Sequence, residues 1–481
     1  MYAPALMFPS IPYAKEYVYT ATDANGEIHT FTADNPLAPL TPIWKDLPTG
    51  FVELKVEGIH FETKKKYISG VRTFYKSAPF PGREALPGRD YSYRECATKA
   101  LRFAFNDPVT RYWLDHGKPD PNYHLNVYPA KMISAVVKGM IAYAKLEPEN
   151  ADKAMKLATN AADYLISITY GSSSRLKGLP PTYFFRDMNQ EETVKNIPIA
   201  KEREHTVMMI YPANAGIMYL ELEAATGDEK YLDAARAIAD FYKSHVLENG
   251  SFYLMESDAD EERTQFNYCV HFNLLNFFSM LYRRTGDEDV HILERNYYSF
   301  LEKTCYDNYN WEGQFEDTAL SGNYRNLTHF AADSMIHYIA ENFADDPEKV
   351  RAGEELMRFV EDQFVVWSDF APWTEHFREG VTWYSPAGLE QYLWYVPIDG
   401  STGAIMRAFI SAYKLTGDEL MKEKALALGD SITRVQDSDT GMILTHWMSN
   451  DWANTIEHFW INCHLGTAAA MVELAEFMGE I

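Results

Sequence analysis

The chain has 481 residues, a formal net charge of −25, four cysteines, and 46% hydrophobic residues. This length accommodates one large domain and a small one. The strong negative charge would repel nucleic acid and anionic lipid, so neither is expected as a partner. The four cysteines show no CxxC spacing, which argues against a disulfide framework and a zinc site: Cys96, Cys269, Cys305 and Cys463.

Two further absences bear on where the protein works. No run of about 18 apolar residues occurs, so no membrane span is expected. The N-terminal residues Met1, Tyr2, Ala3 and Pro4 do not open a charged region followed by an apolar core. The sequence as written therefore predicts a cytoplasmic protein, whereas a leader missing from it would imply a periplasmic or secreted one.

Residues 1–88 predict a small antiparallel β-domain of immunoglobulin or fibronectin type. Short runs rich in β-branched and aromatic residues cover 17–22, 27–32, 51–58 and 67–76, and Asn25-Gly26 is typical of a hairpin turn. The segment that follows, up to Arg89, is rich in proline and predicts a linker. A structural role is expected for this β-sandwich-like domain, with a carbohydrate-binding module as the alternative. The sequence does not single out an exposed aromatic triad.

Residues 211–245 predict two helices folded against each other. The first half is apolar on almost every side, which is typical of a buried helix, and the second half is apolar on one face only. Between them lies Thr226-Gly227-Asp228. Glycine adopts the left-handed conformation that ends a helix, and aspartate caps the next one.

The same hairpin recurs along residues 89–481. Thr285-Gly286-Asp287, Asp345-Asp346-Pro347 and Thr416-Gly417-Asp418 repeat the turn, with spacings of 59, 60 and 71 residues starting from Thr226. Glu147-Pro148-Glu149 marks an earlier copy, and a helix at 459–478 can pair with one at 91–105. Six hairpins predict a mainly α domain that forms an (α/α)6 barrel, a toroid of inner and outer helices.

In such a ring, every connection from an outer helix to the next inner helix lies at the same end, which we call the mouth. These connections are long and rich in aromatic, histidine and carboxylate residues, whereas the hairpin turns are short. Loops on a rigid scaffold commonly carry function. Tryptophan and tyrosine faces suit sugar rings, and they are concentrated here: Trp311, Trp373, Trp383, Trp394, Trp447, Trp452, Trp460, Tyr123, Tyr211, Tyr309, Tyr324, Tyr384 and Tyr392.

Polar residues inside the apolar helices give a second signal. His329 and Asp333 are four residues apart near the start of one such helix, and His271 and His464 hold comparable positions in two others. A buried charge costs several kcal/mol unless it is paired. A shared site at the mouth explains this repetition, although each histidine alone is equally well explained as a hydrogen-bonded core residue.

This pattern resembles the six-hairpin glycosidase superfamily, which includes unsaturated glucuronyl hydrolases, the N-acylglucosamine 2-epimerase group and the β-glucuronidases of glycoside hydrolase family 154. An N-terminal β-domain followed by the barrel is most similar to the last group. The resemblance covers about residues 89–481 and implies a carbohydrate-active enzyme, specifically an exo-acting glycoside hydrolase that removes a uronic acid with carboxylate acid/base catalysis. Its substrate would be an oligosaccharide or glycoside.

Glycoside cleavage needs two carboxyl groups. Asp333 ranks first, because burial in an apolar helix would raise its pKa, and Glu204 and Asp399 follow because each precedes an inner helix. Glu390, Asp451 and Glu457 are further mouth carboxylates. The residues expected to bind substrate are His205, Tyr211, Asn267, His271, Tyr324, Arg325, His329, Trp394 and His464, and Arg186 is a further candidate for holding a substrate carboxylate.

No nucleotide-binding glycine loop, HExxH or GxSxG occurs, so neither a cofactor nor a metal is expected. Two alternative functions stay open. A uronate polysaccharide lyase or sugar epimerase on the same barrel would use His271, His329 or Tyr324 as its base, and a non-catalytic glycan-binding protein would need the aromatics alone. Homo-oligomerisation also stays open.

Overall fold

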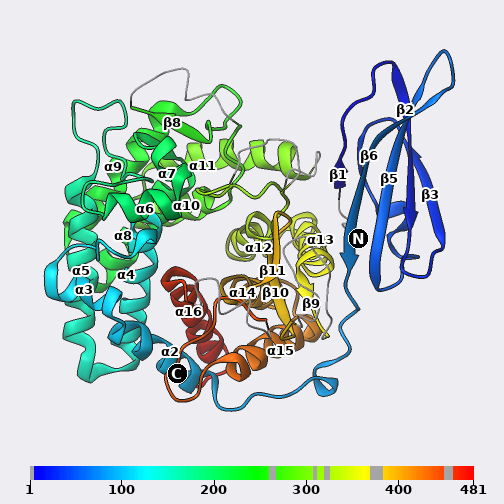
Figure 1. Ribbon diagram of the computed structural model, residues 1–481. Helices are drawn as coiled ribbons and strands as arrows, with labels where there is room; N and C mark the ends of the chain where they lie inside the picture. The colour runs from blue at the N-terminus through cyan, green and yellow to red at the C-terminus, as the bar shows by residue number, and fades with distance from the viewer. Residues whose placement is uncertain (1–4, 259–266, 307–310, 319–325, 369–382, 449–458) are drawn as a thin grey trace.

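The computed structural model describes residues 5–258, 267–306, 311–318, 326–368, 383–448 and 459–481. A small β-domain stands beside a ring of helices, and an extended linker runs along the ring to connect them (Figure 1). Within the described residues, no helix combines the length and apolar character needed to cross a bilayer.

The β-domain is built on one antiparallel four-stranded sheet with the order β3-β2-β5-β6. Alternating residues such as Tyr19 and Leu54 face its core, which also contains Trp44. This is a simpler arrangement than the immunoglobulin-type sandwich expected from the sequence. The elements are β1 (Ala5–Met7), β2 (Ala14–Thr22), β3 (Ile28–Ala33), β4 (Leu37–Pro39), which pairs with β1, α1 (Thr41–Trp44), β5 (Gly50–His60) and β6 (Lys66–Lys76).

Two contacts attach this domain to the ring. The indole Nε1 of Trp44 donates a hydrogen bond of 3.0 Å to Asp362 Oδ2, and Tyr392 packs against the β-domain core. In the linker, the guanidinium of Arg83 forms an ion pair of 2.9 Å with Asp430. The β-domain is therefore joined to the ring by side chains as well as by the chain itself.

Six inner helices form a closed ring within the described residues (Figure 1). Each contacts the next in chain order, and the last returns to the first, which confirms the predicted (α/α)6 barrel. They are α4 (Pro129–Leu146), α8 (Ile210–Thr226), α10 (Asn273–Thr285), α12 (Phe330–Asn342), α14 (Asp399–Thr416) and α16 (Ile461–Phe477).

Each inner helix packs against an outer helix. The sixth pair joins the two ends of the domain, α16 with α2, as the sequence predicts. The outer helices are α2 (Tyr93–Asn106), α5 (Ala151–Ile168), α9 (Glu229–His245), α11 (Glu288–Leu301), α13 (Pro347–Phe364) and α15 (Glu419–Val435), and smaller elements are α3 (Pro108–His116), α6 (Gln190–Asn196), α7 (Pro198–Glu202), β7 (Thr206–Met208), β8 (Met255–Ser257), β9 (Val365–Val366), β10 (Ala387–Gln391) and β11 (Trp394–Pro397).

The recurrent Thr-Gly-Asp turn works as its sequence indicates. Gly227, Gly286 and Gly417 have φ values of 72°, 69° and 69°, in the left-handed region that ends a helix. The aspartate that follows each glycine caps the next helix; Asp228, for example, accepts a hydrogen bond of 3.1 Å from the backbone N–H of Lys230. The hairpins thus turn sharply at one end and leave the long connections at the other.

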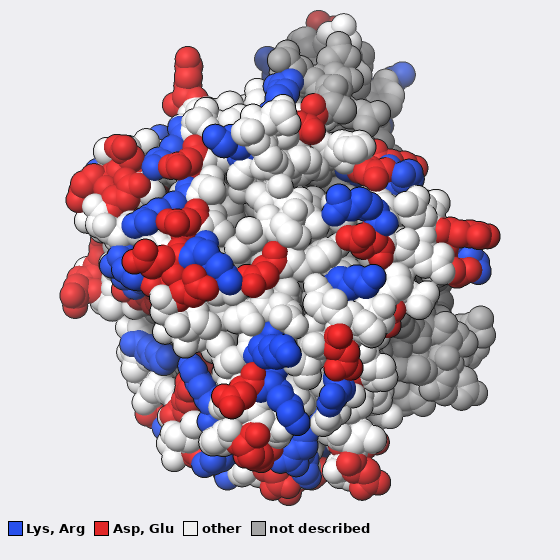
Figure 2. Space-filling model, turned by 90° about the vertical axis from the view of Figure 1, so that its left-hand side faces the viewer, with Lys and Arg blue, Asp and Glu red and all other residues white. Residues whose placement is uncertain are grey.

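The outer surface is a mixture of both charges. Figure 2 shows basic and acidic side chains interspersed over the face formed by the first outer helices. Ion pairs such as Lys230–Asp163 at 2.9 Å and Lys243–Asp240 at 2.7 Å account for part of this pattern. This face therefore carries no extended region of a single charge.

Candidate active site

Three elements bring a lysine, a glutamate and a tyrosine together at the mouth. Lys131 lies in the first turn of α4, Tyr211 in the first turn of α8, and Glu316 in the connection between α11 and α12. Lys131 Nζ and Tyr211 OH donate hydrogen bonds to the two carboxylate oxygens of Glu316. Glu316 is only 1% exposed, so both of its oxygens are bound inside the protein.

The main chain around Glu316 is also held in place. The Arg203 guanidinium donates hydrogen bonds of 2.7 Å to the carbonyl oxygens of Glu316 and Thr318, and Tyr183 OH donates one of 2.9 Å to the Glu316 carbonyl. Asp317 lies between these two anchored carbonyls, and its side chain is exposed to solvent. A loop carboxylate is thereby presented from a fixed backbone.

The charges in this cluster push the carboxyl pKa values apart. Burial tends to raise the pKa of Glu316, but the Lys131 ammonium and the hydrogen bonds from Lys131 and Tyr211 outweigh it and hold this pKa below its usual value. Asp317 behaves in the opposite way. Desolvation by the surrounding protein and repulsion by Glu316 raise its pKa to about 6, although water reaches the side chain.

Glu390 adds a third carboxyl group from strand β10. Burial raises its pKa to about 7, and the negative charges of Asp317 and Glu316 act in the same direction. Gln391 Nε2 donates a hydrogen bond of 3.2 Å to Glu390 Oε2, and Asn326 Nδ2 in turn donates one of 2.6 Å to Gln391 Oε1. Glu390 is half-buried.

Asp399, predicted from the sequence as catalytic, is the first residue of α14 and is fully buried. Burial raises the pKa of Asp399 well above its usual value, and the backbone N–H of Gly400 donates a hydrogen bond of 2.7 Å to it. The negative charge of Glu390 also raises the Asp399 pKa, so Asp399 borders the same cluster. Solvent does not reach the Asp399 side chain.

Asp333, in the first turn of α12, pairs with His329, the residue that precedes this helix. His329 Nδ1 lies 2.5 Å from Asp333 Oδ2, His329 is fully buried, and Asp333 is 8% exposed. Burial raises the pKa of Asp333, against the attraction of His329 and Arg407. Both residues were predicted at the site. The His329 ring contacts Phe330 and Phe364 at centroid distances of 4.1 and 5.7 Å.

The other sequence candidates are more scattered. Glu204 forms an ion pair with Lys201 on the surface, and His205 beside it is exposed with a positive φ of 71°. Among the described residues, neither side chain forms a hydrogen bond or ion pair with Glu316, Asp317 or Glu390. Arg186 is also exposed, and its guanidinium carbon lies 5.0 Å from the centroid of the Phe184 ring.

Three of the predicted substrate-binding residues have backbone or carboxylate partners. Asn267 Nδ2 lies 3.4 Å from Glu312 Oε2, and His271 Nδ1 accepts a hydrogen bond of 3.2 Å from the Asn273 backbone. The ring nitrogens of His464 bind the Ile443 N–H at 3.2 Å and the Ala100 carbonyl at 2.8 Å, inside the core. Since both ring nitrogens are occupied, His464 offers none to a substrate in this arrangement.

The mouth aromatics divide into two groups. Trp311, Trp383 and Trp447 are buried and fill the core. Trp394 is half-buried at the start of β11 and, like Trp460, approaches the His446 ring edge-on, with centroid distances of 6.0 and 5.0 Å. Tyr123 and Tyr392 are half-buried and Tyr384 is exposed, whereas seven further candidates lie outside the described residues: Trp373, Trp452, Tyr309, Tyr324, Arg325, Asp451 and Glu457.

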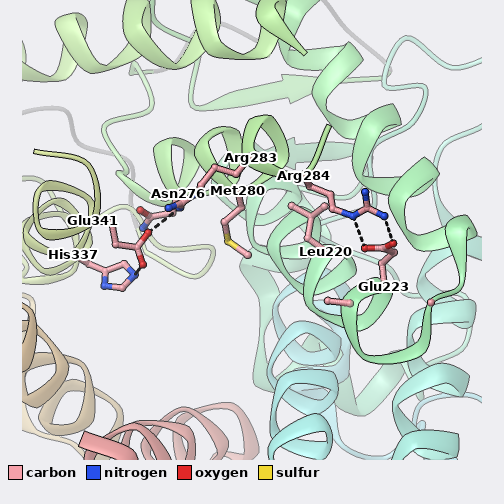
Figure 3. Close-up of a pocket in the computed structure, with 10 residues that line it drawn as sticks. Leu220, Glu223, Asn276, Met280, Arg283, Arg284, His337 and Glu341 are labelled. Atoms are coloured by element: carbon pink, nitrogen blue, oxygen red, sulfur yellow. Dashed lines mark hydrogen bonds and ion pairs between the residues drawn. The ribbon is translucent and has the colours of Figure 1, made fainter. Parts of the chain in front are cut away.

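A hollow of about 720 Å³ lies at the hairpin-turn end, away from the mouth. Figure 3 shows its charged residues already paired with one another. Arg284 binds Glu223 at 2.6 Å, and Glu341 binds both Arg283 at 2.9 Å and His337 at 3.2 Å. Its charges balance within the protein, so the mouth carboxylates are the better candidates for chemistry.

One possible metal-binding group occurs in the β-domain. Asp23, Glu27 and His29 place three ligand atoms within 4.8 Å of one another, the one such group among the described residues. Asp23 already accepts hydrogen bonds from the backbone N–H groups of Asn25 and Glu27 and contacts His29 Nε2 at 2.9 Å. These contacts are those of a β-turn and need no ion.

The sequence reasoning missed the centre of the cluster. Glu316, Asp317 and Lys131 were not among the expected site residues, although the connection containing Glu316 and Asp317 was identified as a mouth loop. The available signal was a pair of consecutive carboxylates in that loop. Tyr211 and Glu390, both named from the sequence, interact with Glu316 in the structure, Tyr211 by a hydrogen bond and Glu390 through its charge.

No family model matches this sequence, and a search of curated proteins finds no match. Solved structures do match it. The chain resembles a glycoside hydrolase family 76 α-mannanase from Bacteroides thetaiotaomicron, with 13% identity, a TM-score of 0.53, and coverage of 81% of this chain and 97% of that one. It also resembles cellobiose 2-epimerases from Spirochaeta thermophila and Bacillus thermoamylovorans.

The two epimerases have identities of 14% and 12% and TM-scores of 0.52 each. Their alignments cover 80% and 78% of this chain, and 98% and 99% of theirs. The fold is an (α/α)6 barrel. At such low identity, the likeness establishes the fold, and the chemistry must be argued from the side chains of this chain.

Proposed function

We propose that this protein is a glycoside hydrolase in which Asp317 and Glu390 form the catalytic pair. The observation that carries the proposal is the grouping of these two solvent-accessible carboxyl groups beside buried Glu316, whose charge raises the pKa of both. When Asp317 is ionised, its negative charge raises the pKa of Glu390 and favours the protonated form of Glu390. An ionised and a protonated carboxyl group at one site are what glycoside cleavage requires.

Each carboxyl group then has a role. Glu390 donates its proton to the glycosidic oxygen as the bond to the leaving group breaks. Asp317 acts on the other side of the sugar, either attacking the anomeric carbon or taking a proton from the attacking water. Glu316 has both oxygens bound by Lys131 and Tyr211 and is 1% exposed, so we assign it to positioning Asp317, whose pKa its negative charge raises.

The finer proposal is that the sugar released is a uronic acid, as in the β-glucuronidases of glycoside hydrolase family 154. Lys131 supports this proposal. Its ammonium binds Glu316, but its side chain is 30% exposed, so a substrate carboxylate can also reach it. A charge-assisted hydrogen bond to a substrate carboxylate contributes roughly 1.5–3 kcal/mol, or about 10- to 150-fold in affinity. Comparing an aryl glucuronide with the matching aryl glucoside tests this preference.

The catalytic pair is tested with Asp317→Asn, Glu390→Gln and, as a matched control, Asp333→Asn. The first two should lower kcat by about 10²–10⁴-fold on alkyl glycosides. A dinitrophenyl leaving group needs no proton, so Glu390→Gln should regain much of its rate on that substrate, while Asp317→Asn should not. Near-normal turnover in both variants, with a large loss in Asp333→Asn, would return the chemistry to the residue favoured by the sequence.

A sugar epimerase is the second candidate. It is favoured by the mouth histidine His446, whose ring lies between the Trp394 and Trp460 rings, and by His271, whose pKa burial lowers to about 4, so that it stays neutral. An epimerase exchanges the hydrogen at C2 of a reducing sugar with solvent deuterium without releasing a sugar. A lyase would instead produce an unsaturated product that absorbs ultraviolet light.

A further inference from the structure

The end of the β-domain sheet carries an exposed group of aromatic rings. Tyr13 is 70% exposed, and its ring centroid lies 5.5 Å from that of His60 and 6.5 Å from that of Phe61. The His60 and Phe61 rings are nearly parallel, with an interplanar angle of 10° and a centroid distance of 5.7 Å. Three rings therefore form one surface at the start of the turn between β5 and β6.

The backbone holds these rings in place. The Phe61 N–H donates a hydrogen bond of 3.0 Å to the Tyr13 carbonyl, which ties the two segments together. His60 Nδ1 accepts bonds of 3.3 Å from the N–H groups of Glu62 and Thr63, so the imidazole is anchored. Tyr13 itself has a left-handed φ of 62°, which turns it out of the strand direction.

Four lysines lie on the same two segments as the rings. Lys15 Nζ lies 5.3 Å from the Phe61 ring centroid, a cation–π distance, and Lys64, Lys65 and Lys66 follow in the exposed turn. Glu16 and Glu62 are the acidic side chains adjacent in sequence. Four lysines against two glutamates make this a basic region in a chain of net charge −25.

We propose that this region, the hairpin tip (Tyr13, Lys15, His60, Phe61 and Lys64–Lys66), binds acidic polysaccharide. Aromatic faces pack against the apolar faces of pyranose rings, and the lysines pair with uronate or sulfate groups along the polymer. The choice of a glycan over another polyanion rests on the proposed function of the barrel. Ring stacking and charge are combined here at a place distinct from the mouth.

The position of the tip suits an accessory role. Strand β6 runs from Lys66 at the tip to Lys76, whose ammonium contacts the carbonyls of Trp44 and Leu47 near the junction with the barrel. Eleven residues of β-strand span about 35 Å. A polymer bound at the tip would therefore keep the enzyme on its substrate without filling the mouth.

The experiment measures retardation of the full chain in native gels that contain polygalacturonate, with dextran as the neutral polymer. Wild type should be retarded by polygalacturonate only. The triple variant Lys64→Ala/Lys65→Ala/Lys66→Ala should bind about tenfold more weakly. Phe61→Ala should also weaken binding, and its effect should persist at 0.5 M salt, where simple ion exchange is suppressed.

Controls separate the tip from the mouth and from general charge. The variant Lys153→Ala/Lys156→Ala/Lys177→Ala removes three exposed lysines of the barrel and should bind like wild type. Tip variants should keep wild-type turnover of a small aryl glycoside, so a failed binding test and a failed hydrolase assignment remain distinguishable. Unchanged retardation in the tip variants, no effect of Phe61→Ala, or equally tight binding to single-stranded DNA or anionic vesicles would overturn the proposal.

Discussion

Lys131 and Glu316 are 185 residues apart in the chain and form an ion pair at the centre of the barrel mouth. This pair links the first inner helix to the connection that precedes the fourth. The negative charge that it holds on Glu316 helps raise the pKa of the adjacent Asp317. A contact between two distant parts of the ring therefore also influences the protonation of the proposed catalytic residue Asp317.

Replacing Lys131 by methionine should destabilise the protein. Glu316 would remain buried without its cation, at a cost of about 2–3 kcal/mol, below the roughly 3–5 kcal/mol of a fully buried pair because water reaches Lys131. The pKa of Glu316 is depressed in the folded protein, so this stability is present above its ordinary value near 4.5 and is lost as pH falls through the folded pKa.

Urea unfolding of wild type and Lys131→Met from pH 4 to 8 measures this difference, which should be largest at neutral pH and shrink in acid. Lys138→Met on the same helix is the control, since Lys138 pairs with Glu221 at 3.5 Å and both side chains are more than a third exposed. It should cost at most about 1 kcal/mol. Equal losses in the two variants would mean that the Glu316 pair is an ordinary surface pair.

His464 should make the protein sensitive to mild acid. Burial lowers its pKa from 6.5 to about 4. Because the unfolded chain binds this proton more readily, stability should fall as pH drops from 6.5 towards 4, by about 1.4 kcal/mol per unit. His464→Gln keeps one donor and one acceptor but cannot take the proton. In this variant, the free energy of unfolding should fall less steeply as pH drops from 6.5 towards 4. An unchanged pH dependence would exclude His464 as its source.

Two inner-helix glycines should respond oppositely to alanine. A Cβ on Gly216 would lie 2.3 Å from Phe277 Cε2, whereas one on Gly466 would meet nothing within 4 Å. Gly216→Ala should therefore destabilise by about 1–3 kcal/mol through overpacking, and Gly466→Ala should stabilise by about 0.5–1 kcal/mol through helix propensity. Thermal unfolding of both variants decides this, and a stabilised Gly216→Ala would contradict the close packing of α8 against α10.

The fold was largely predictable from the sequence. Thr-Gly-Asp turns stop and restart helices through local chemistry, so three hairpin turns could be located from their own residues. The pairing of α16 with α2 also followed, because a ring of hairpins has to close.

The site was less predictable, because its burial comes from distant contacts. Nothing local to Glu316 indicates that Lys131 and Tyr211 will enclose it. Asp333 stood out as a charge in an apolar helix, and the structure pairs it with His329, four residues earlier. The tryptophans at 311, 383 and 447 looked like sugar platforms in sequence and fill the core instead. The two residues that enclose Glu316 lie 185 and 105 residues away along the chain.

The most direct test is the pH dependence of kcat/KM for wild type and Glu390→Gln on the glycoside found to be cleaved. Wild type should give a narrow bell, falling below a pH of about 6 as Asp317 is protonated and above about 7 as Glu390 ionises. In Glu390→Gln, the alkaline fall should disappear and the acid fall remain. A variant that keeps both limbs and a near-normal rate would contradict the assignment of Glu390 as the proton donor.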